Sequence, residues 1–512
     1  MGPMSGAGGP KIVAPGAGYA LALLLAINLF NYIDRYVLAA ILPLLAIDAE
    51  MVDPSDPDLQ GKLGLLTTAF MVSYFLFSPV FAWLGGRMNR WAMVGCGVLV
   101  WSVASGSSGL AGSYAALFLA RCFVGIGEAA YGPVAPSMLS DLYPIERRGR
   151  MMALFYMAIP VGSALGYVIG GQVAAASGHW RESFLVTFAG GLFGLFCFLM
   201  RDPNRSRGRE AEPVARPSYL SVLRGLGRNR SFIMCCIGMT CTTFILGGVA
   251  VWVPSYIFQR ESRFVLDDAA IARLEDMKDT AGNPLVQRDV VATLRGTAGP
   301  KVFDFAGFRD HLVKALPADA RKQYSARIYD AATAPGSISN GKATFIFGGI
   351  TVVSGLLATL LGGIVGDRLR GRIRGAYFHV IGWSTLLALP FFIAMLYVSF
   401  PWAWVMIFFT VFWLFFNTGP ANTILANVTR SEIRATAFAI NILVIHLLGD
   451  AISPWIIGTI ADRSNLHTAF LIVSLFIPAA GILWVLGARH LDADTARADQ
   501  ERTDTIQATN PA

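Results

Sequence analysis

Residues 84–90 read LGGRMNR, and residues 365–370 read VGDRLR. Each run follows a long apolar stretch, so the same short basic loop occurs twice in the chain, 281 residues apart. A second pair repeats at a similar interval, because Glu146 and Glu432 both stand before arginines at the start of an apolar stretch, 286 residues apart. Two loop types repeated at nearly one offset predict a chain of two related halves.

The composition around these loops is typical of a membrane protein. The 512 residues are 54% hydrophobic and only 14% charged, whereas soluble domains carry about 25% charged residues. This balance excludes a soluble enzyme domain and a disordered chain. The absence of basic runs interleaved with aromatic residues argues against nucleic-acid binding. All six cysteines lie in apolar stretches, so the sequence predicts neither a disulfide framework nor a zinc site.

A transmembrane helix needs about 20 apolar residues, and twelve stretches qualify. They are residues 17–45, 63–85, 92–111, 115–139, 151–176, 183–200, 232–258, 344–365, 375–397, 402–427, 436–460 and 468–488. The polar tail after them, residues 491–512, is expected to lack structure.

Lysine and arginine are distributed unevenly between the connections. With the N-terminus inside, the tails and inner loops hold 23 of these residues and the short outer connections hold three. This asymmetry predicts that both termini are cytoplasmic. The polar insertion 260–342 then lies outside, since long segments cross regardless of their charge. Its helix-like runs at 267–279 and 304–316 predict a small cap of short helices.

Two six-helix halves joined by a basic linker resemble the major facilitator superfamily. The resemblance implies an all-α membrane fold of twelve transmembrane helices with a substrate site near the midplane. The repeated loop implies gating by Arg87, Asp367 and Arg368, although Gly86 stands where the superfamily has an acidic residue. The predicted divisions are an N-terminal half (1–200), a cytoplasmic linker (201–230), a C-terminal half (231–488) that contains the insertion, and a cytoplasmic tail (489–512).

Five charged residues lie within the apolar stretches, and four of them fall at similar depth. Charged groups are expensive in hydrocarbon and normally mark a pathway. At ~1.5 Å per residue, Asp34 and Arg35 of the first stretch lie between Arg121 and Glu128 of the fourth in depth. Arg121 and Glu128 share one helix face, as do Asn31 and Arg35. The sequence therefore predicts a cluster of two acids and two arginines, for which a functional role is favoured over a purely structural ion-pair network.

The fifth charged residue, Asp450, has His446 one turn before it. This pair is either a second functional polar site or a simple polar contact, and the sequence leaves both interpretations open. Gly162, Gly166 and Gly170, spaced four residues apart, predict close helix packing.

Three runs resemble the Spinster branch of the superfamily: NYIDR at 31–35, RCFVGIGEA at 121–129 and FYMAIPVGSALGY at 155–167. Spinster proteins are transporters of lipids such as sphingosine-1-phosphate and lysophospholipids. The resemblance implies that Arg35, Arg121 and Asn31 bind a lipid headgroup and that Asp34 and Glu128 couple transport to protons. It implies a monomer whose partners are an amphipathic lipid, protons and the bilayer, with no cofactor, no metal and no nucleic acid.

Other classes of function fit the sequence less well. The run from Gly336 to Lys342 has the spacing of a phosphate-binding loop, but Ala343 replaces the required Ser or Thr. A membrane-embedded lipid enzyme is disfavoured because the chain has no Gly-x-Ser-x-Gly and no His-Glu-x-x-His motif. A proton-coupled transporter of a soluble organic anion, such as a sugar acid, is the alternative, because paired arginines suit any carboxylate or phosphate. The outer connections lack N-glycosylation acceptors, which fits a bacterial inner membrane.

Overall fold

The computed structural model of the chain describes residues 15–48, 51–54, 56–85, 87–201, 219–278, 282–430 and 433–509. The N-terminal tail, Gly86, Glu432 and most of the 201–230 linker lie outside the described residues. The contacts between residues divide the chain into two compact units. Unit 1 comprises Met1–Ser206, Ala250–Gly349 and Gly458–Leu466, and unit 2 comprises Arg207–Val249, Ile350–Ile457 and His467–Ala512.

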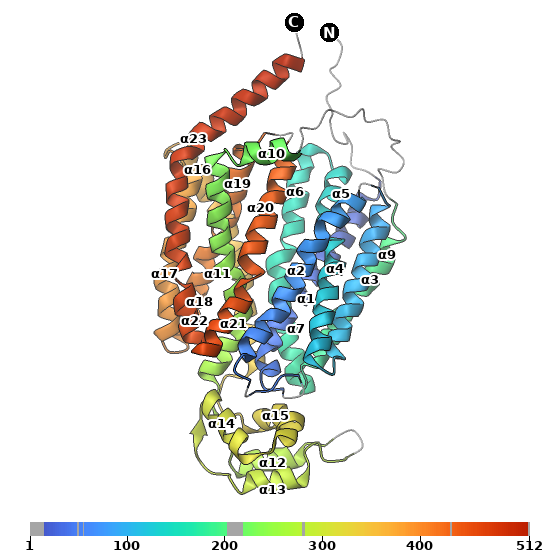
Figure 1. Cartoon of the computed structure of the whole chain (residues 1–512), viewed down its shortest axis with the longest axis vertical. Coiled ribbons are helices and arrows are strands. Elements are labelled where there is room, and N and C mark those ends of the chain that lie inside the picture. Colours follow the sequence, from blue (N-terminus) through green and yellow to red (C-terminus); the bar gives the residue numbers. More distant parts are fainter. Residues whose placement is uncertain are drawn as a thin grey trace. The chain divides into compact units, whose positions relative to one another are not determined.

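Unit 1 contains the helices of the first half of the chain (Figure 1). They are α1 (Ala17–Leu45), α2 (Leu59–Gly85), α3 (Arg90–Gly109), α4 (Tyr114–Ala129), α5 (Ala135–Leu142), α6 (Ile145–Tyr156), α7 (Ala158–Ser177), α8 (Arg181–Phe188) and α9 (Gly191–Cys197). The first helix has the bounds that its apolar stretch predicts.

Helix α7 packs closely on α1 through its spaced glycines. A Cβ atom at Gly162 would lie 2.7 Å from the Tyr32 Cβ, and one at Gly166 would lie 2.6 Å from the Ile33 carbonyl oxygen. A Cβ at Gly170 would lie 2.8 Å from the Ala40 Cβ. Side chains do not tolerate such distances, so the predicted close packing is confirmed, and α1 and α7 form one rigid pair.

Ten helices of the described residues are long and apolar enough to cross a membrane. The two other predicted spans, 115–139 and 183–200, are helical but interrupted. In the first, a turn after Ala129 separates α4 from α5, and in the second a turn at Ala189 and Gly190 separates α8 from α9. Glycine and proline in the first turn, at Gly132 and Pro133, explain why a single long helix does not form there.

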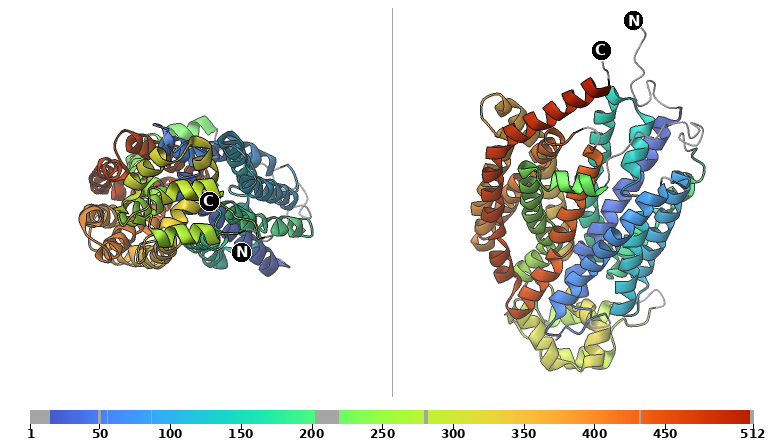
Figure 2. Two further views of the ribbon diagram at one scale, coloured as in Figure 1. Left: turned by 90° about the horizontal axis from the view of Figure 1, so that it is seen from below. Right: turned by 45° about the horizontal axis from the view of Figure 1, so that its top comes forward.

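The insertion forms a compact group of short helices with a core of its own (Figures 1 and 2). Its elements are β1 (Phe264–Val265), α12 (Asp268–Asp276), α13 (Arg288–Arg295), β2 (Val302–Phe303), α14 (Phe305–Ala315) and α15 (Ala318–Ala332). Both predicted helical runs are confirmed, since Asp267 and Asp304 accept backbone N–H bonds at the starts of α12 and α14. The antiparallel pairing of β1 with β2 was not predicted.

Unit 2 is built from the helices of the second half of the chain, and four of them begin or end within unit 1. The helices are α10 (Tyr219–Leu226), α11 (Arg230–Glu261), α16 (Asn340–Arg370), α17 (Ala376–Tyr397), α18 (Trp402–Phe415), α19 (Thr418–Asn427), α20 (Arg434–Ile445), the π-helix η2 (His446–Asp450), α21 (Ser453–Arg463), α22 (Leu466–Val473) and α23 (Phe476–Thr509).

The expectation that the tail 491–512 lacks structure is wrong for its described part, because α23 continues to Thr509. Asp494 on this extension accepts a hydrogen bond from the Ser231 backbone N–H at 2.9 Å, which ties the tail to the start of α11. It also pairs with Arg497 at 3.7 Å, one turn further along the same helix. Polar residues spaced for such pairs are compatible with a solvated helix as well as with a disordered chain.

Candidate functional site

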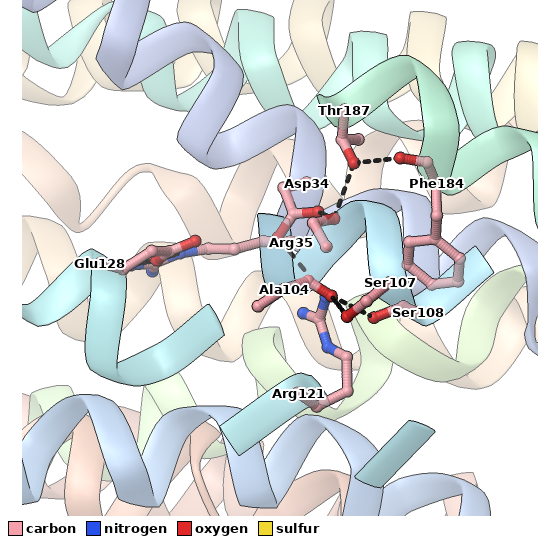
Figure 3. Close-up of polar contacts among 10 residues, drawn as sticks. Asp34, Arg35, Ala104, Ser107, Ser108, Arg121, Glu128, Phe184 and Thr187 are labelled. Carbon is pink, nitrogen blue, oxygen red and sulfur yellow. Dashed lines mark hydrogen bonds and ion pairs between the residues drawn. The ribbon is translucent and has the colours of Figure 1, made fainter. Parts of the chain in front are cut away.

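The predicted charged cluster comes together in unit 1 as two ion pairs between α1 and α4. In the first pair, the Arg35 guanidinium donates from Nη2 and Nε to Glu128 Oε2, at 2.7 and 2.9 Å (Figure 3). The Glu128 side chain is fully buried, whereas 14% of the Arg35 side chain is exposed. A short, charge-assisted contact is the strong type of ion pair, and Arg35 is its more exposed member.

The second pair, Asp34 with Arg121, is fully buried. Arg121 Nη1 lies 3.4 Å from Asp34 Oδ2, a longer contact than that of the first pair, and neither side chain is exposed. The Nε and Nη2 atoms of Arg121 are buried without a hydrogen-bond partner, and so is Glu128 Oε1. Unpaired buried polar atoms are costly, so this site holds hydrogen-bonding capacity that its own residues do not satisfy.

Aromatic rings surround the guanidinium groups. The Arg35 guanidinium carbon lies 5.0 Å from the ring centre of Tyr32, 5.1 Å from that of Phe70 and 5.3 Å from that of Tyr74. The same Phe70 ring lies 5.3 Å from the Arg121 guanidinium carbon, so it contacts both arginines. Cation–π contacts hold each guanidinium in place, and the rings add an apolar wall beside the charge.

Helix α2 approaches α4 closely at this point because Gly125 has no side chain. A Cβ atom there would lie 2.2 Å from the Phe70 carbonyl oxygen and 2.9 Å from the Tyr74 backbone nitrogen. Gly125 lies midway between Arg121 and Glu128 on their shared face of α4. The glycine therefore allows the aromatic residues of α2 to reach both arginines.

Sequence reasoning missed a hydroxyl group that contacts Asp34 and a second hydroxyl group that contacts the first. The Ser105 Oγ of α3 is in short hydrogen-bond contact with Asp34 Oδ1, and it lies 2.6 Å from the Thr187 Oγ1 of α8. Thr187 Oγ1 is in turn 2.6 Å from the Phe184 carbonyl oxygen (Figure 3). Both side chains are buried. Asn31, a predicted binding residue, is also buried one turn before Arg35.

The predicted gate residues lie at the two repeated loops. Arg87 is exposed, donates to the Trp83 carbonyl oxygen at 3.3 Å and covers the Trp83 ring at 3.9 Å. Asp367 accepts a hydrogen bond from the Tyr377 hydroxyl at 2.8 Å, and Arg368 is exposed. Arg87 belongs to unit 1 and the other two to unit 2, so the structure describes each loop by itself.

The first loop also contains a pair that the sequence analysis did not select. The Arg90 Nη1 lies 2.6 Å from Asp141 Oδ2, which links the start of α3 to α5. Arg90 is the last residue of the repeated basic loop at 84–90, so the sequence did contain an indication of this pair.

His446 and Asp450 are in contact in unit 2, at the two ends of the π-helix η2. The His446 Nδ1 lies 2.9 and 2.8 Å from the two carboxylate oxygens of Asp450. Both side chains are partly exposed, 31% and 15%. Helix α11 comes close here, since a Cβ at Gly247 would lie 2.1 Å from the Asp450 Cβ. π-Helical turns are frequent at functional sites, but this geometry fits both interpretations of the pair.

Comparisons with known proteins agree with this architecture. The family model for the Major Facilitator Superfamily matches residues 24–270. The human protein spinster homolog 1 is 31% identical over 510 aligned residues, covering 95% of this chain and 83% of the human protein. The protein spinster of Drosophila melanogaster is 30% identical over 453 residues, covering 88% of this chain. The chain spans 62% of the length of that fly relative.

Solved structures show the same fold. A bacterial homolog of the human lysosomal transporter Spinster, in an inward-facing and unoccupied conformation, aligns with a TM-score of 0.65 and 19% identity over 95% of this chain and 99% of its own. A D-xylose–proton symporter aligns with a TM-score of 0.59 and 14% identity over 91% of this chain and 96% of its own. At these identities the structures show the fold alone. The sequence relatives show the family as well as the fold. This chain is an integral, multi-pass membrane protein that belongs to the Spinster family of major facilitator proteins, which are transporters rather than enzymes.

Proposed function

We propose that this transporter moves an amphipathic lipid, such as a sphingolipid or a lysophospholipid, by alternating access. The observation that carries the proposal is the setting of Arg35. Its guanidinium is partly accessible, is paired with a buried acid and is faced by the rings of Tyr32, Phe70 and Tyr74. A cation beside an apolar aromatic wall suits a ligand that has an anionic headgroup and an apolar chain.

In this proposal Arg35 makes the first contact with the headgroup, and Arg121 completes the site after a rearrangement. Arg121 has two unpartnered guanidinium nitrogens but is fully buried in the present conformation. A phosphate or carboxylate can bind two parallel N–H groups of an arginine. Asn31, one turn before Arg35, contributes its amide to the same headgroup.

Proton coupling is the second part of the proposal and is assigned to Asp34 and Glu128. Each acid is paired with an arginine of the headgroup site. Protonation of an acid weakens its hold on the arginine, which then becomes available to the substrate. Deprotonation restores the pair and expels the headgroup. Proton binding and substrate binding are thereby linked, as reciprocal coupling requires.

The organisation around the site follows from the sequence. Both termini and the 201–230 linker are assigned to the cytoplasm, and the insertion 260–342 to the outside. Arg87, Asp367 and Arg368 are assigned to an inner gate, and His446 with Asp450 to a secondary polar site. The protein is proposed to act as a monomer, in a bacterial inner membrane.

The experiment is a binding and uptake screen in proteoliposomes with lysophospholipids, sphingoid lipids and sugar acids. We expect the lipids to bind and to be transported when a pH gradient is imposed. Arg35→Lys should weaken lipid binding about tenfold, because a point charge replaces the planar fork. Arg309→Lys, at an exposed arginine of the insertion, is the matched control and should not change it.

Two results would contradict the proposal. Undiminished lipid binding after both Arg35 and Arg121 are changed to alanine, in protein shown to be folded, would remove the headgroup assignment. Binding and transport of sugar acids without lipids would instead support the soluble-anion alternative, for which the same arginines would serve.

A further inference from the structure

The oxygen–oxygen contacts around Asp34 need more protons than the hydroxyl groups of Ser105 and Thr187 can supply. Three successive contacts join Asp34 Oδ1 to Ser105 Oγ, then to Thr187 Oγ1, then to the Phe184 carbonyl oxygen. Each hydrogen bond needs one proton. Serine and threonine carry one each, and a carbonyl carries none. The third proton must come from the carboxyl group.

The two protonation states of Asp34 therefore differ in how well they fit this chain. With Asp34 protonated, the carboxyl donates to Ser105, Ser105 donates to Thr187, and Thr187 donates to Phe184, so all three contacts are hydrogen bonds. With Asp34 ionised, two protons serve three contacts, and one pair of oxygens faces each other with lone pairs only. The 2.6 Å separations of the second and third contacts are those of O–H···O bonds.

We propose that Ser105 and Thr187 are positioning residues that receive and hold the proton of Asp34, so that this conformation is the proton-loaded one. The inference rests on the proposed proton coupling and divides the roles of the two acids. Asp34 carries the transported proton here, and Glu128 stays ionised as the partner of Arg35. The contact lengths agree, since Arg35 lies 2.7 Å from Glu128 while Arg121 lies 3.4 Å from Asp34.

The other groups around Asp34 do not complete the chain. The charged groups that face it are Arg121 and Glu128, both from α4, and its neighbour Arg35 on α1. Helix α7, which packs along α1, contributes no charged side chain and only Tyr167 as a titratable group, whose hydroxyl donates to the Ala250 carbonyl oxygen. From α3 and α8 the polar contacts to Asp34 are the Ser105 hydroxyl and, through it, the Thr187 hydroxyl.

Infrared difference spectroscopy of the purified protein across a pH titration tests the inference directly. The carbonyl stretch of a protonated carboxyl group reports the proton without any substrate. We expect such a band to titrate in the wild type, to vanish in Asp34→Asn and to remain in Glu128→Gln. Absence of any band that depends on Asp34 would overturn the proposal.

The direction in which two hydroxyl variants move the midpoint of this band decides whether the carboxyl group or Ser105 is the donor. Ser105→Ala removes the acceptor of the Asp34 proton, so the midpoint of the band should move to lower pH by about half to one unit. Thr187→Val should move it the same way by less, and Thr187→Ser should restore it. If Ser105 instead donates to an ionised carboxylate, Ser105→Ala moves the midpoint to higher pH, and that result would refute the chain.

Ser108→Ala is the matched control. Ser108 is a buried serine of the same helix whose hydroxyl donates to the Ala104 carbonyl oxygen, so its removal should leave the midpoint unchanged. The spectra need neither lipid nor a gradient. Failure of lipid binding or of pH-driven transport would therefore refute the proposed function while leaving this result in place, and an alkaline shift would refute the inference while leaving transport in place.

Discussion

The ion pair between Arg35 and Glu128 should be the stronger of the two pairs in the site, and a double-mutant cycle can measure the difference. The perturbation is Arg35→Gln, Glu128→Gln and the two together, compared with Arg121→Gln, Asp34→Asn and their combination. Glutamine and asparagine remove charge while keeping much of the shape. A cycle isolates the interaction between the two members of a pair from the effects of each single change.

The magnitude follows from the geometry. Arg35 makes two contacts with one carboxylate oxygen, at 2.7 and 2.9 Å, and Glu128 is fully buried. Opposite charges ~4 Å apart attract by about 4 kcal/mol at an effective dielectric constant near 20. The partial exposure of Arg35 and the polar contacts that glutamine retains reduce this value, so we expect a coupling energy of roughly 2–3 kcal/mol. For Arg121 and Asp34, whose contact is 3.4 Å, we expect roughly 1 kcal/mol or less.

Reversible unfolding in mixed detergent micelles, at one pH for all variants, gives the free energies. Equal coupling in the two cycles would refute the reasoning, because it would mean that Asp34 is ionised and bound to Arg121 as firmly as Glu128 is to Arg35. The same variants separate the functional roles. Wild-type, pH-dependent net transport by both Asp34→Asn and Glu128→Gln would remove proton coupling from the site.

Three further predictions concern the scaffold. Gly166→Ala should destabilise the protein by about 1–3 kcal/mol in the same unfolding assay, because the added Cβ overlaps α1. Gly349→Ala, which has open space around it, is the control and should not destabilise the protein. Equal effects of the two variants would contradict the packing argument. Asp462→Ala should speed hydrogen exchange of the first amides of α2, because its carboxylate accepts two of them at 2.7 Å; unchanged exchange would show that these bonds add no protection. In a cysteine-free background, an impermeant reagent applied from outside should label a cysteine at the exposed Ala292 and not one at the exposed Gly371; the reverse pattern would invert the topology.

The helices were predictable from the sequence where the apolar pattern alone decides them. The bounds of α1 match its apolar stretch because the few polar residues within it, Asn28, Asn31 and the charged pair, do not interrupt the apolar pattern. The breaks after Ala129 and at Gly190 were missed because a count of apolar residues gives no weight to turn-forming residues such as Gly132, Pro133 and Gly190. The helical tail was missed because its stability depends on a distant contact, that of Asp494 with the start of α11.

The similar depth of the four charged residues was predictable from the sequence, but the pairing of acids with arginines was not. A rise of ~1.5 Å per residue brings Asp34 and Arg35 between Arg121 and Glu128, but which acid meets which arginine depends on the rotation of α1 about its axis. That rotation is set by α7, through the contacts of Gly162 and its neighbours.

The hydroxyl groups near Asp34 could not be predicted from the sequence, for a different reason. Serines in apolar helices usually donate to a carbonyl of their own helix, as Ser107 and Ser108 do. Ser105, in the same run of small residues, forms its hydrogen bond with Asp34 instead. Nothing in the sequence distinguishes it from its neighbours.

Because α1 is one continuous helix, it connects the site to the end of unit 1 at which the insertion lies. The helix is continuous and locked against α7, so a displacement at its charged pair must move its far end as well. At that end Asn340 donates to the Ala40 carbonyl oxygen at 2.9 Å, Ile47 is buried in the core of the insertion, and Asp48 accepts a hydrogen bond from Trp180 at 2.6 Å. Release of Arg35 from Glu128 and of Arg121 from Asp34 would separate α1 from α4 at the level of the site but not from these contacts. Any motion that opens the site must therefore carry the insertion with α1, or break bonds that can be counted and tested one at a time.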